Sequence, residues 1–325
     1  MAATISTYII SVRFFTFQDA KLQKPCKIQF FSQIFCFYEI KPYICAIKTI
    51  CMKKLLLLIT IILSTSTLFA YDFIHPMGGR AAAMGGSSVA SQGLWALQNN
   101  PAGMANLEKI SLGLYYENRW LLPETAYKCG AFALPTKFGT LGVSFNQFGS
   151  SKYNENKFGL AYAKDFGRYL QIGLQLDYLL LKIGNEYGSF RAVTFELGIQ
   201  SQVTDRLTLG TYIFNPINFS FEQTLNHEKI PIVFRFGLAY KFTKDFIGQC
   251  EIEKNTDREG VSLRGGLEYE AVRNLYIRAG VQTNPGILSF GLGYAIRFVQ
   301  INVAGQLHNQ LGASLQVGMI FSIGK

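Results

Sequence analysis

Charge, histidine and long apolar runs are all scarce in this 325-residue chain. Charged residues make up 16% of the sequence, well below the roughly 25% of ordinary soluble proteins. No apolar run approaches the roughly 20 residues that a membrane-spanning helix needs. Aromatic residues nevertheless make up 14%, and glycine occurs 31 times. This combination is typical of a membrane β-barrel.

Catalytic and metal-binding patterns are missing as well. The three histidines, His75, His227 and His308, have no nucleophile at a spacing that would pair with them. A metalloprotease helix motif, a phosphate-binding loop and paired cysteine ligands are absent. We therefore expect no catalytic residue, no metal site and no cofactor, and the chain is not predicted to be an enzyme.

The beginning of the chain does not match the rest. Residues 1–51 hold four of the six cysteines and show no clear periodicity. Met52 then begins a secretory signal pattern, with two lysines, an apolar core at 55–63 and a cleavage region that ends at Ala70. Because such a signal belongs at the start of a chain, we predict that 1–51 is a gene-model extension and 52–70 the signal peptide. The alternative is a genuine N-terminal domain followed by an anchor, although the apolar core is too short to span a bilayer as a helix.

Little charge remains once these segments are set aside. The whole chain has a formal charge of +10; residues 1–51 contribute +4, and Lys53 with Lys54 contributes +2. The part from Tyr71 onward therefore carries +4, which is too little to indicate nucleic-acid binding. The cysteines left in that part form no disulfide framework or metal-ligand pattern.

From residue 108 to 325, apolar and polar residues alternate over segments of roughly ten residues. In 169–180, every even-numbered position is apolar, whereas Gln171, Gln175 and Asp177 lie on the other face. A soluble β-sandwich also alternates, but its strands are usually about five or six residues long. Tilted membrane strands need about 9–11 residues, which matches these segments. We predict an all-β fold, a transmembrane antiparallel β-barrel over 108–325.

Fourteen such segments can be counted, and the connections between them alternate in length. The segments begin near Lys109, Thr125, Leu141, Lys157, Tyr169, Ala192, Leu207, Ile232, Phe246, Gly260, Leu275, Ile287, Ile301 and Gly312. Connections after even-numbered segments are short, and most of those after odd-numbered segments are longer, as at 215–231. Short periplasmic turns and long outer loops are the rule in such barrels. This parity predicts an outer-membrane protein of a Gram-negative bacterium with both chain ends in the periplasm.

A stretch of small residues precedes the alternating region. Residues 76–107 are rich in Gly, Ala and Ser, and Arg80 is their one charged residue. A flexible linker is the alternative, but a linker this apolar would have little reason to stay in water. We therefore expect 71–107 to form an N-terminal hatch inside the barrel, with Arg80 paired to a lumen carboxylate such as Glu196 or Glu268.

Glycines recur at inward positions of the predicted strands: Gly173, Gly198, Gly210, Gly237, Gly280, Gly291, Gly293 and Gly318. Glycine in a strand marks a close approach by another backbone, which supports a hatch. Easing of barrel curvature is the alternative explanation for these glycines.

Charged residues of both signs are also predicted to face the lumen: Asp177, Glu196, Arg235, Arg264, Glu268, Arg278 and Arg297. Their mixed signs favour mutual pairing across the lumen or with the hatch, because structural ion pairs are the commoner cause of such clusters. A substrate path is the other interpretation.

Two short runs carry a family resemblance. Gly-Gly-Arg80-Ala-Ala-Ala-Met-Gly-Gly-Ser and Asn100-Pro-Ala-Gly-Met104 resemble the start of the FadL-like outer-membrane proteins. That group includes channels for fatty acids and other hydrophobes. It also includes the PorV/PorQ-type proteins of the Bacteroidetes, some of which serve type IX secretion. In the family, the Asn-Pro-Ala-Gly run lies in a hatch inside a fourteen-stranded barrel.

The resemblance implies a hatch and ligand path formed by Arg80, Asn99, Asn100, Pro101, Ala102 and Gly103. A plain turn is the alternative for this run, because Asn-Pro favours turn initiation. The resemblance implies passive uptake of hydrophobic small molecules, with the ligand and outer-membrane lipid as partners. The rival is a PorV/PorQ-type protein that binds a secretion-system partner, which the shortage of long loops favours slightly. The apolar loop 215–231 suits either a hydrophobe or a partner.

Overall fold

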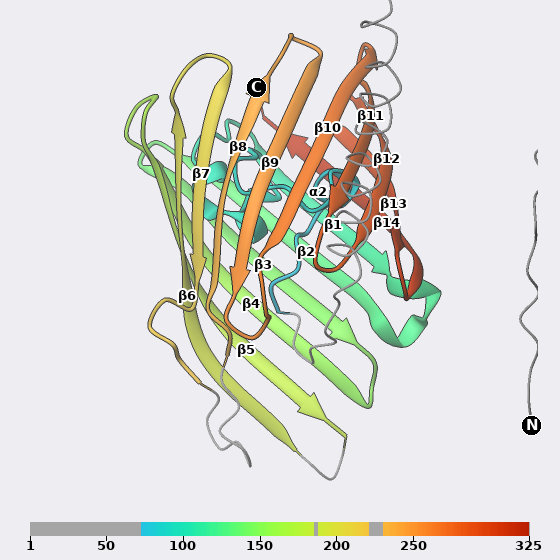
Figure 1. Ribbon diagram of the computed structural model, residues 1–325. Coiled ribbons are helices and arrows are strands. Elements are labelled where there is room, and N and C mark those ends of the chain that lie inside the picture. The colour runs from blue at the N-terminus through green and yellow to red at the C-terminus, as the bar shows by residue number, and fades with distance from the viewer. Residues whose placement is uncertain (1–72, 185–187, 221–229, 325) are drawn as a thin grey trace, which may run out of the picture. The chain divides into compact units, whose positions relative to one another are not determined.

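The computed structural model describes residues 73–184, 188–220 and 230–324. Over these residues, fourteen antiparallel strands close into one barrel (Figure 1). The predictions of a gene-model extension at 1–51 and a signal peptide at 52–70 fall outside the described residues and stay predictions.

Each strand pairs with its neighbours in sequence, and β1 pairs with β14, so the sheet has no free edge. Closure satisfies the backbone hydrogen bonds that lipid cannot satisfy. The strands are β1 (Ile110–Asn118), β2 (Ala126–Thr136), β3 (Gly139–Gly149), β4 (Tyr153–Asp165), β5 (Gln171–Ile183), β6 (Ser189–Gln202), β7 (Leu207–Phe214), β8 (Val233–Lys241), β9 (Phe246–Asn255), β10 (Ser262–Val272), β11 (Leu275–Gln282), β12 (Ile287–Ile296), β13 (Val299–His308) and β14 (Gly312–Ile323).

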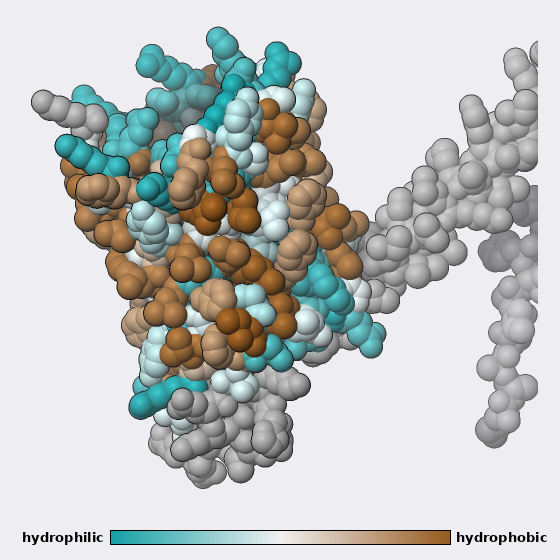
Figure 2. Space-filling model, turned by 90° about the vertical axis from the view of Figure 1, so that its left-hand side faces the viewer, coloured by the Kyte–Doolittle hydropathy of each residue, from teal (hydrophilic) through white to brown (hydrophobic). Residues whose placement is uncertain are grey.

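The outer face of the barrel is apolar and the inner face is polar. In β5, Leu174 and Leu176 are 50% and 54% exposed, whereas Gln175 and Asp177 are fully buried at 0%. Figure 2 shows apolar side chains along the middle of the face in view, with hydrophilic groups gathered at its upper rim. A soluble sandwich would have the reverse distribution, so the predicted phase of the strands is confirmed.

The predicted strand starts lie close to the observed ones, with the largest difference at β4. That strand begins at Tyr153 instead of near Lys157. The reason is that Asn154 and Glu155, which interrupt the apolar alternation, still pair with Lys182 and Leu181 of β5. Backbone pairing thus extends the sheet beyond the part that faces lipid.

The connections gather at two opposite ends of the barrel. We call one end the turn end, because it carries the short turns 137–138, 166–170, 203–206, 242–245, 273–274 and 297–298. We call the other the loop end, because it carries 119–125, 150–152, 256–261, 283–286 and 309–311 and the described parts of 184–188 and 215–232. The alternation of strands places the start of β1 and the end of β14 at the turn end.

The chain before β1 is not part of the sheet. Residues 73–107, which we call the N-terminal segment, contain the helices α2 (Gly79–Ala83) and α3 (Ala96–Asn99) and the 3-10 helix η1 (Pro101–Met104). Figure 1 shows this segment enclosed by the strands. Two further 3-10 helices, η2 (Arg119–Leu121) and η3 (Pro123–Thr125), lie between β1 and β2. Among all helices in the described residues, none is long and apolar enough to cross a membrane.

Candidate functional site

The N-terminal segment supplies the apolar core of the lumen. Around α3 and η1, Trp95, Leu97 and Met104 pack with inward residues of β1 to β4, including Tyr115 and Ala161. Phe73 and Val89 belong to a second cluster with residues of β5 to β8, and Ala82 and Ala83 of α2 meet Ala304 of β13 in a third. The polar inner wall is thus covered by a segment that brings its own apolar side chains.

Glycines in the wall let the backbone of the segment approach closely. A Cβ at Gly173 would collide with the Pro101–Ala102 backbone, and one at Gly280 would collide with Met84 and Gly85. A Cβ at Gly210 would meet the Val89 carbonyl. Gly293 is different, because it makes room for Arg278 and Asn302 of the wall itself. Close approach, more than barrel curvature, accounts for most of these inward glycines.

The run from Asn99 to Gly103 is fully buried and richly hydrogen-bonded. Asn99 bonds reciprocally with Met77, whose N–H donates to Oδ1 at 2.9 Å and whose carbonyl accepts from Nδ2 at 2.9 Å. Asn100 accepts from the Ala102 N–H at 3.2 Å, which caps η1. Its Nδ2 donates to the Val89 carbonyl at 2.7 Å. These two asparagines therefore tie distant parts of the N-terminal segment together.

Pro101 and Gly103 fit the same arrangement. Pro101 occupies the first turn of η1, where its missing N–H costs nothing. A Cβ at Gly103 would collide with the Ser91 carbonyl, so this glycine permits close packing, and its backbone is not left-handed. The run is more than a plain turn, because it packs on β5 and β6 through Gly173 and Gly198.

Arg80 joins α2 to the wall through Glu268, one of the two partners that the sequence suggested. Its Nε and Nη2 donate to the Glu268 carboxylate at 2.7 and 2.8 Å. Burial lowers the pKa of Arg80, but the charge and hydrogen bonds of Glu268 together with the influence of Tyr276 outweigh burial, and the pKa ends above its usual value. Glu268 also accepts from Arg278, which in turn donates to Asn302 Oδ1 at 2.8 Å. A chain of polar contacts thus runs from α2 across β10, β11 and β13.

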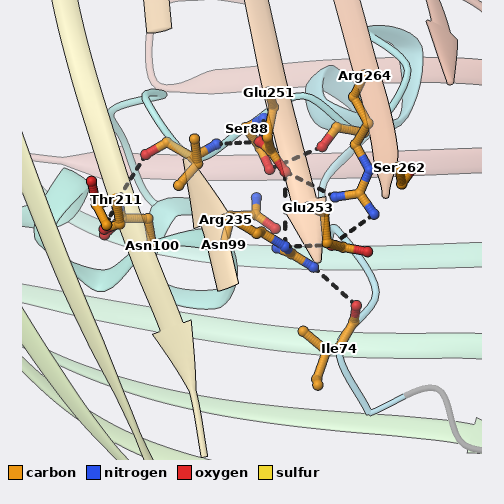
Figure 3. A network of polar contacts seen from close by, with 12 residues as sticks. Ile74, Ser88, Asn99, Asn100, Thr211, Arg235, Glu251, Glu253, Ser262 and Arg264 are labelled. Atoms are coloured by element: carbon orange, nitrogen blue, oxygen red, sulfur yellow. Dashed lines mark hydrogen bonds and ion pairs between the residues drawn. The ribbon is translucent and has the colours of Figure 1, made fainter. Parts of the chain in front are cut away.

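A second charged network holds the segment against β8, β9 and β10 (Figure 3). Arg235 pairs with Glu253 at 2.6 Å, and Arg264 pairs with Glu251 at 2.9 Å. Glu251 also accepts the backbone N–H groups of Ser88 and Val89 at 2.7 and 2.8 Å. The arginines thus neutralise Glu251, which positions the segment, and its neighbour Glu253, and Arg235 also donates to the Ile74 carbonyl at 3.0 Å.

A third cluster lies on the wall at β4 to β6. Lys157 pairs with Glu196 at 2.6 Å and lies 4.0 Å from Asp177. Gln175 donates to Asp177 at 2.8 Å. Two carboxylates share one cation here, in a site that water does not reach.

Six of the seven predicted lumen charges therefore point inward and take part in ion pairs. The exception is Arg297, whose placement in the lumen was wrong. It is exposed and lies in the 297–298 turn, because β12 ends at Ile296 and the chain reverses there. Within the described residues, no group of three or more His, Cys, Asp or Glu side chains could hold a metal ion.

Two cavities lie on opposite sides of α2. The loop-end cavity, of about 150 Å³, is lined by Ala82 and Gly86 of the segment and by the loop ends of β1, β11 and β13. The turn-end cavity, of about 230 Å³, is lined by Arg80 and Ala81 of α2, by residues between Ser88 and Leu107, and by the turn ends of β1, β13 and β14. A short helix of small residues thus separates the two.

The loop-end cavity has a mixed lining. Its apolar members include Ile74, Trp120 and Leu311. Its charged members include Glu117, which accepts from His75 Nε2 at 2.8 Å. No sequence pattern signals the Glu117–His75 contact, because the two residues meet only when β1 closes around the segment.

Solved structures share this architecture. The CymD monoaromatic hydrocarbon channel is 14% identical, with 79% of this chain and 100% of that chain covered and a TM-score of 0.58. The toluene transporters TodX of Pseudomonas putida and TbuX of Ralstonia pickettii are each 13% identical. The match covers 79% of this chain and 98% of TodX, with a TM-score of 0.56. For TbuX, it covers 77% of this chain and 98% of that chain, with a TM-score of 0.57.

This chain is FadL-like in fold. A FadL homologue of Pseudomonas aeruginosa also matches, at 13% identity over 79% of this chain and 98% of that chain, with a TM-score of 0.51. No family model and no curated protein matches the sequence. The expected fourteen-stranded outer-membrane barrel fold is confirmed, and at these identities the likeness is one of fold.

Proposed function

We propose that this protein is an outer-membrane channel for the passive uptake of hydrophobic small molecules, and that the N-terminal segment is its hatch. The observation that carries the proposal is the pair of cavities on opposite sides of α2. A solute that enters from either end meets a cavity first and the segment second. The structures that share the fold are named as hydrocarbon channels and transporters, which supports the same solute class.

The proposed orientation follows from the connections. Short turns face the periplasm in such barrels, so the turn end and both ends of the barrel chain lie there. The loop-end cavity then opens outward, and its apolar residues Trp120 and Leu311 meet the solute first. The structures named above are channels and transporters, so they give the PorV/PorQ-type alternative no support.

The proposed hatch residues have two roles. Five of them fix the folded form of the hatch: Asn99, Asn100, Pro101, Ala102 and Gly103. Arg80 attaches α2 to Glu268. Five charged residues hold the lumen wall and the segment in fixed positions: Asp177, Glu196, Arg235, Arg264 and Arg278.

Deletion of 71–107 tests the proposal. The strands carry the hydrogen-bond ladder without this segment, so the barrel should still close. Ion conductance in planar bilayers should rise from near zero to a porin-like level. Uptake of radiolabelled toluene by whole cells that express the intact protein should exceed that of vector controls several-fold. Unchanged conductance together with vector-level uptake, with the protein shown in the outer membrane, would refute the proposal.

A further inference from the structure

The two parts of the N-terminal segment are attached to the wall very differently. Around Ser88 to Gly103, the wall supplies many hydrogen bonds. Gln200 donates to the carbonyls of Val89 and Ser91, both at 2.9 Å, and Glu251 accepts from two backbone N–H groups. We call Ser88–Gly103 the anchored part. Its buried side chains Val89, Leu94, Trp95 and Leu97 belong to apolar clusters that include buried residues of seven strands.

The helix α2 has a smaller set of attachments. In the described residues, two side chains link it to the wall by hydrogen bonds: Arg80 bonds to Glu268, and Gln306 Nε2 donates to the Ala82 carbonyl at 3.0 Å. Its own apolar contacts are small: Ala82 and Ala83 meet Ala304, and Ala83 also lies over Gly291. Alanine and glycine bury little apolar area, so the helix itself can separate from the strands at a lower cost in packing than the anchored part, and the fully buried Met84 at its C-cap adds to that cost.

Glycines with positive φ lie at both ends of α2. Gly78 precedes the helix with a φ of 102°, and Gly85 and Gly86 follow it with φ of 67° and 78°. Glycine tolerates large changes of backbone angle that other residues resist. Segments that move as a unit are bounded by a few such positions. The helix is therefore bounded on both sides by glycines that can act as hinges once Gly78 leaves its close contact with Trp95 and Gly85 leaves the Val281 backbone.

We infer that α2 is the moving gate of this channel, that the anchored part stays in place, and that the Arg80–Glu268 ion pair is the contact that keeps the gate closed. The inference rests on the proposed function. When α2 leaves the wall of β11 to β14, the loop-end and turn-end cavities join into one path along that side of the lumen. The Asn99–Gly103 run then acts as a fixed base for the gate and does not itself move.

The position of Arg80 fits this role. Its side chain is 25% exposed and lines the turn-end cavity, whereas the Glu268 side chain is 7% exposed. If Arg80 withdraws, Glu268 keeps Arg278 as a partner. The wall is therefore not left with an unpaired buried carboxylate, which is the usual large cost of breaking a buried ion pair.

Two disulfide locks test the inference in a protein whose native Cys129 and Cys250 are replaced by alanine. The gate lock combines Ala83→Cys with Ala304→Cys, residues of one contact cluster. The control lock combines Gln98→Cys in the anchored part with Asn146→Cys in β3, whose native side chains meet in a 2.8 Å hydrogen bond. Disulfide formation is checked by mass spectrometry, and folding by heat-modifiable mobility in gels.

The expected result is that oxidation of the gate lock lowers toluene uptake at least tenfold, that reductant restores it, and that the control lock changes uptake less than twofold. If both locks block uptake, if neither does, or if the control lock alone does, α2 is not the separate gate, although the channel function stands. If the reduced proteins take up no more toluene than vector controls, the proposed function fails and the gate inference fails with it.

Arg80→Ala provides a second measurement that needs no cross-link. Single-channel recordings should show open events at least ten times as frequent as in the unaltered protein. The matched control is Arg168→Ala, which removes an exposed ion pair with Asp205 at the turn end and should leave the frequency unchanged. Equal frequencies in Arg80→Ala and the unaltered protein would overturn the assignment of the latch.

Discussion

In the cluster of Lys157, Glu196 and Asp177, we predict that substitutions of different members change the free energy of unfolding in opposite directions. All three side chains are at most 3% exposed, and the two carboxylates share one cation. Lys157→Met leaves both carboxylates buried without their partner and should lower the free energy of unfolding by about 3–5 kcal/mol, the usual cost of an unpaired buried charge. Asp177→Asn removes the surplus negative charge instead.

Asp177→Asn should therefore be neutral or stabilising. Lys157 keeps its 2.6 Å contact with Glu196, and the asparagine Oδ1 can still accept from Gln175. Glu196→Gln should be destabilising, because it removes the closer of the two partners. The assay is urea unfolding and refolding in lipid vesicles, followed by tryptophan fluorescence. If Asp177→Asn lowers the free energy of unfolding as much as Lys157→Met does, the reasoning that two carboxylates share one cation is refuted.

Three further predictions concern the membrane, the topology and the start of the mature chain. Leu292→Arg, at a lipid-facing position that is 55% exposed, should cost about 2–4 kcal/mol in the same titration. Gln300→Arg, beside the turn-end cavity, should cost much less, and equal losses would contradict the assigned faces. In a cysteine-free background, an impermeant thiol reagent should label Leu311→Cys in whole cells but not Asp205→Cys, and the reverse pattern would invert the orientation. N-terminal sequencing of the membrane-extracted protein should begin near Tyr71, and recovery of residues 1–51 would contradict the predicted start site.

The parts of the fold that sequence could predict are those set by local pattern. Strand number, phase and approximate bounds follow from alternation with a period of two, because each strand presents one face to lipid and the other to the lumen. The prediction was wrong at Arg297, because alternation was continued past the point at which β12 ends. It also placed the start of β4 near Lys157 instead of at Tyr153. The polar residues between them interrupt the alternation, although their backbone still pairs with β5.

The candidate site was predictable in kind but not in detail. Small residues near Arg80 and inward glycines on the strands indicated a segment packed against the wall. The sequence could not choose between Glu196 and Glu268 for Arg80, because both have the inward phase. The resemblance implied a hatch and ligand path formed by Arg80 and the Asn99–Gly103 run, but it could not show that Arg80 and Ala82 of α2 line two different cavities.

The sequence by itself determined an apolar exterior, a polar lumen and a nearly uncharged segment to place inside it. The tertiary structure decided which lumen groups meet that segment. Arg80 and Glu268 are 188 residues apart in the chain, and they come together only after the β1–β14 pairing closes the barrel. Local periodicity fixes which way a side chain points, whereas barrel closure and strand register fix what lies opposite it.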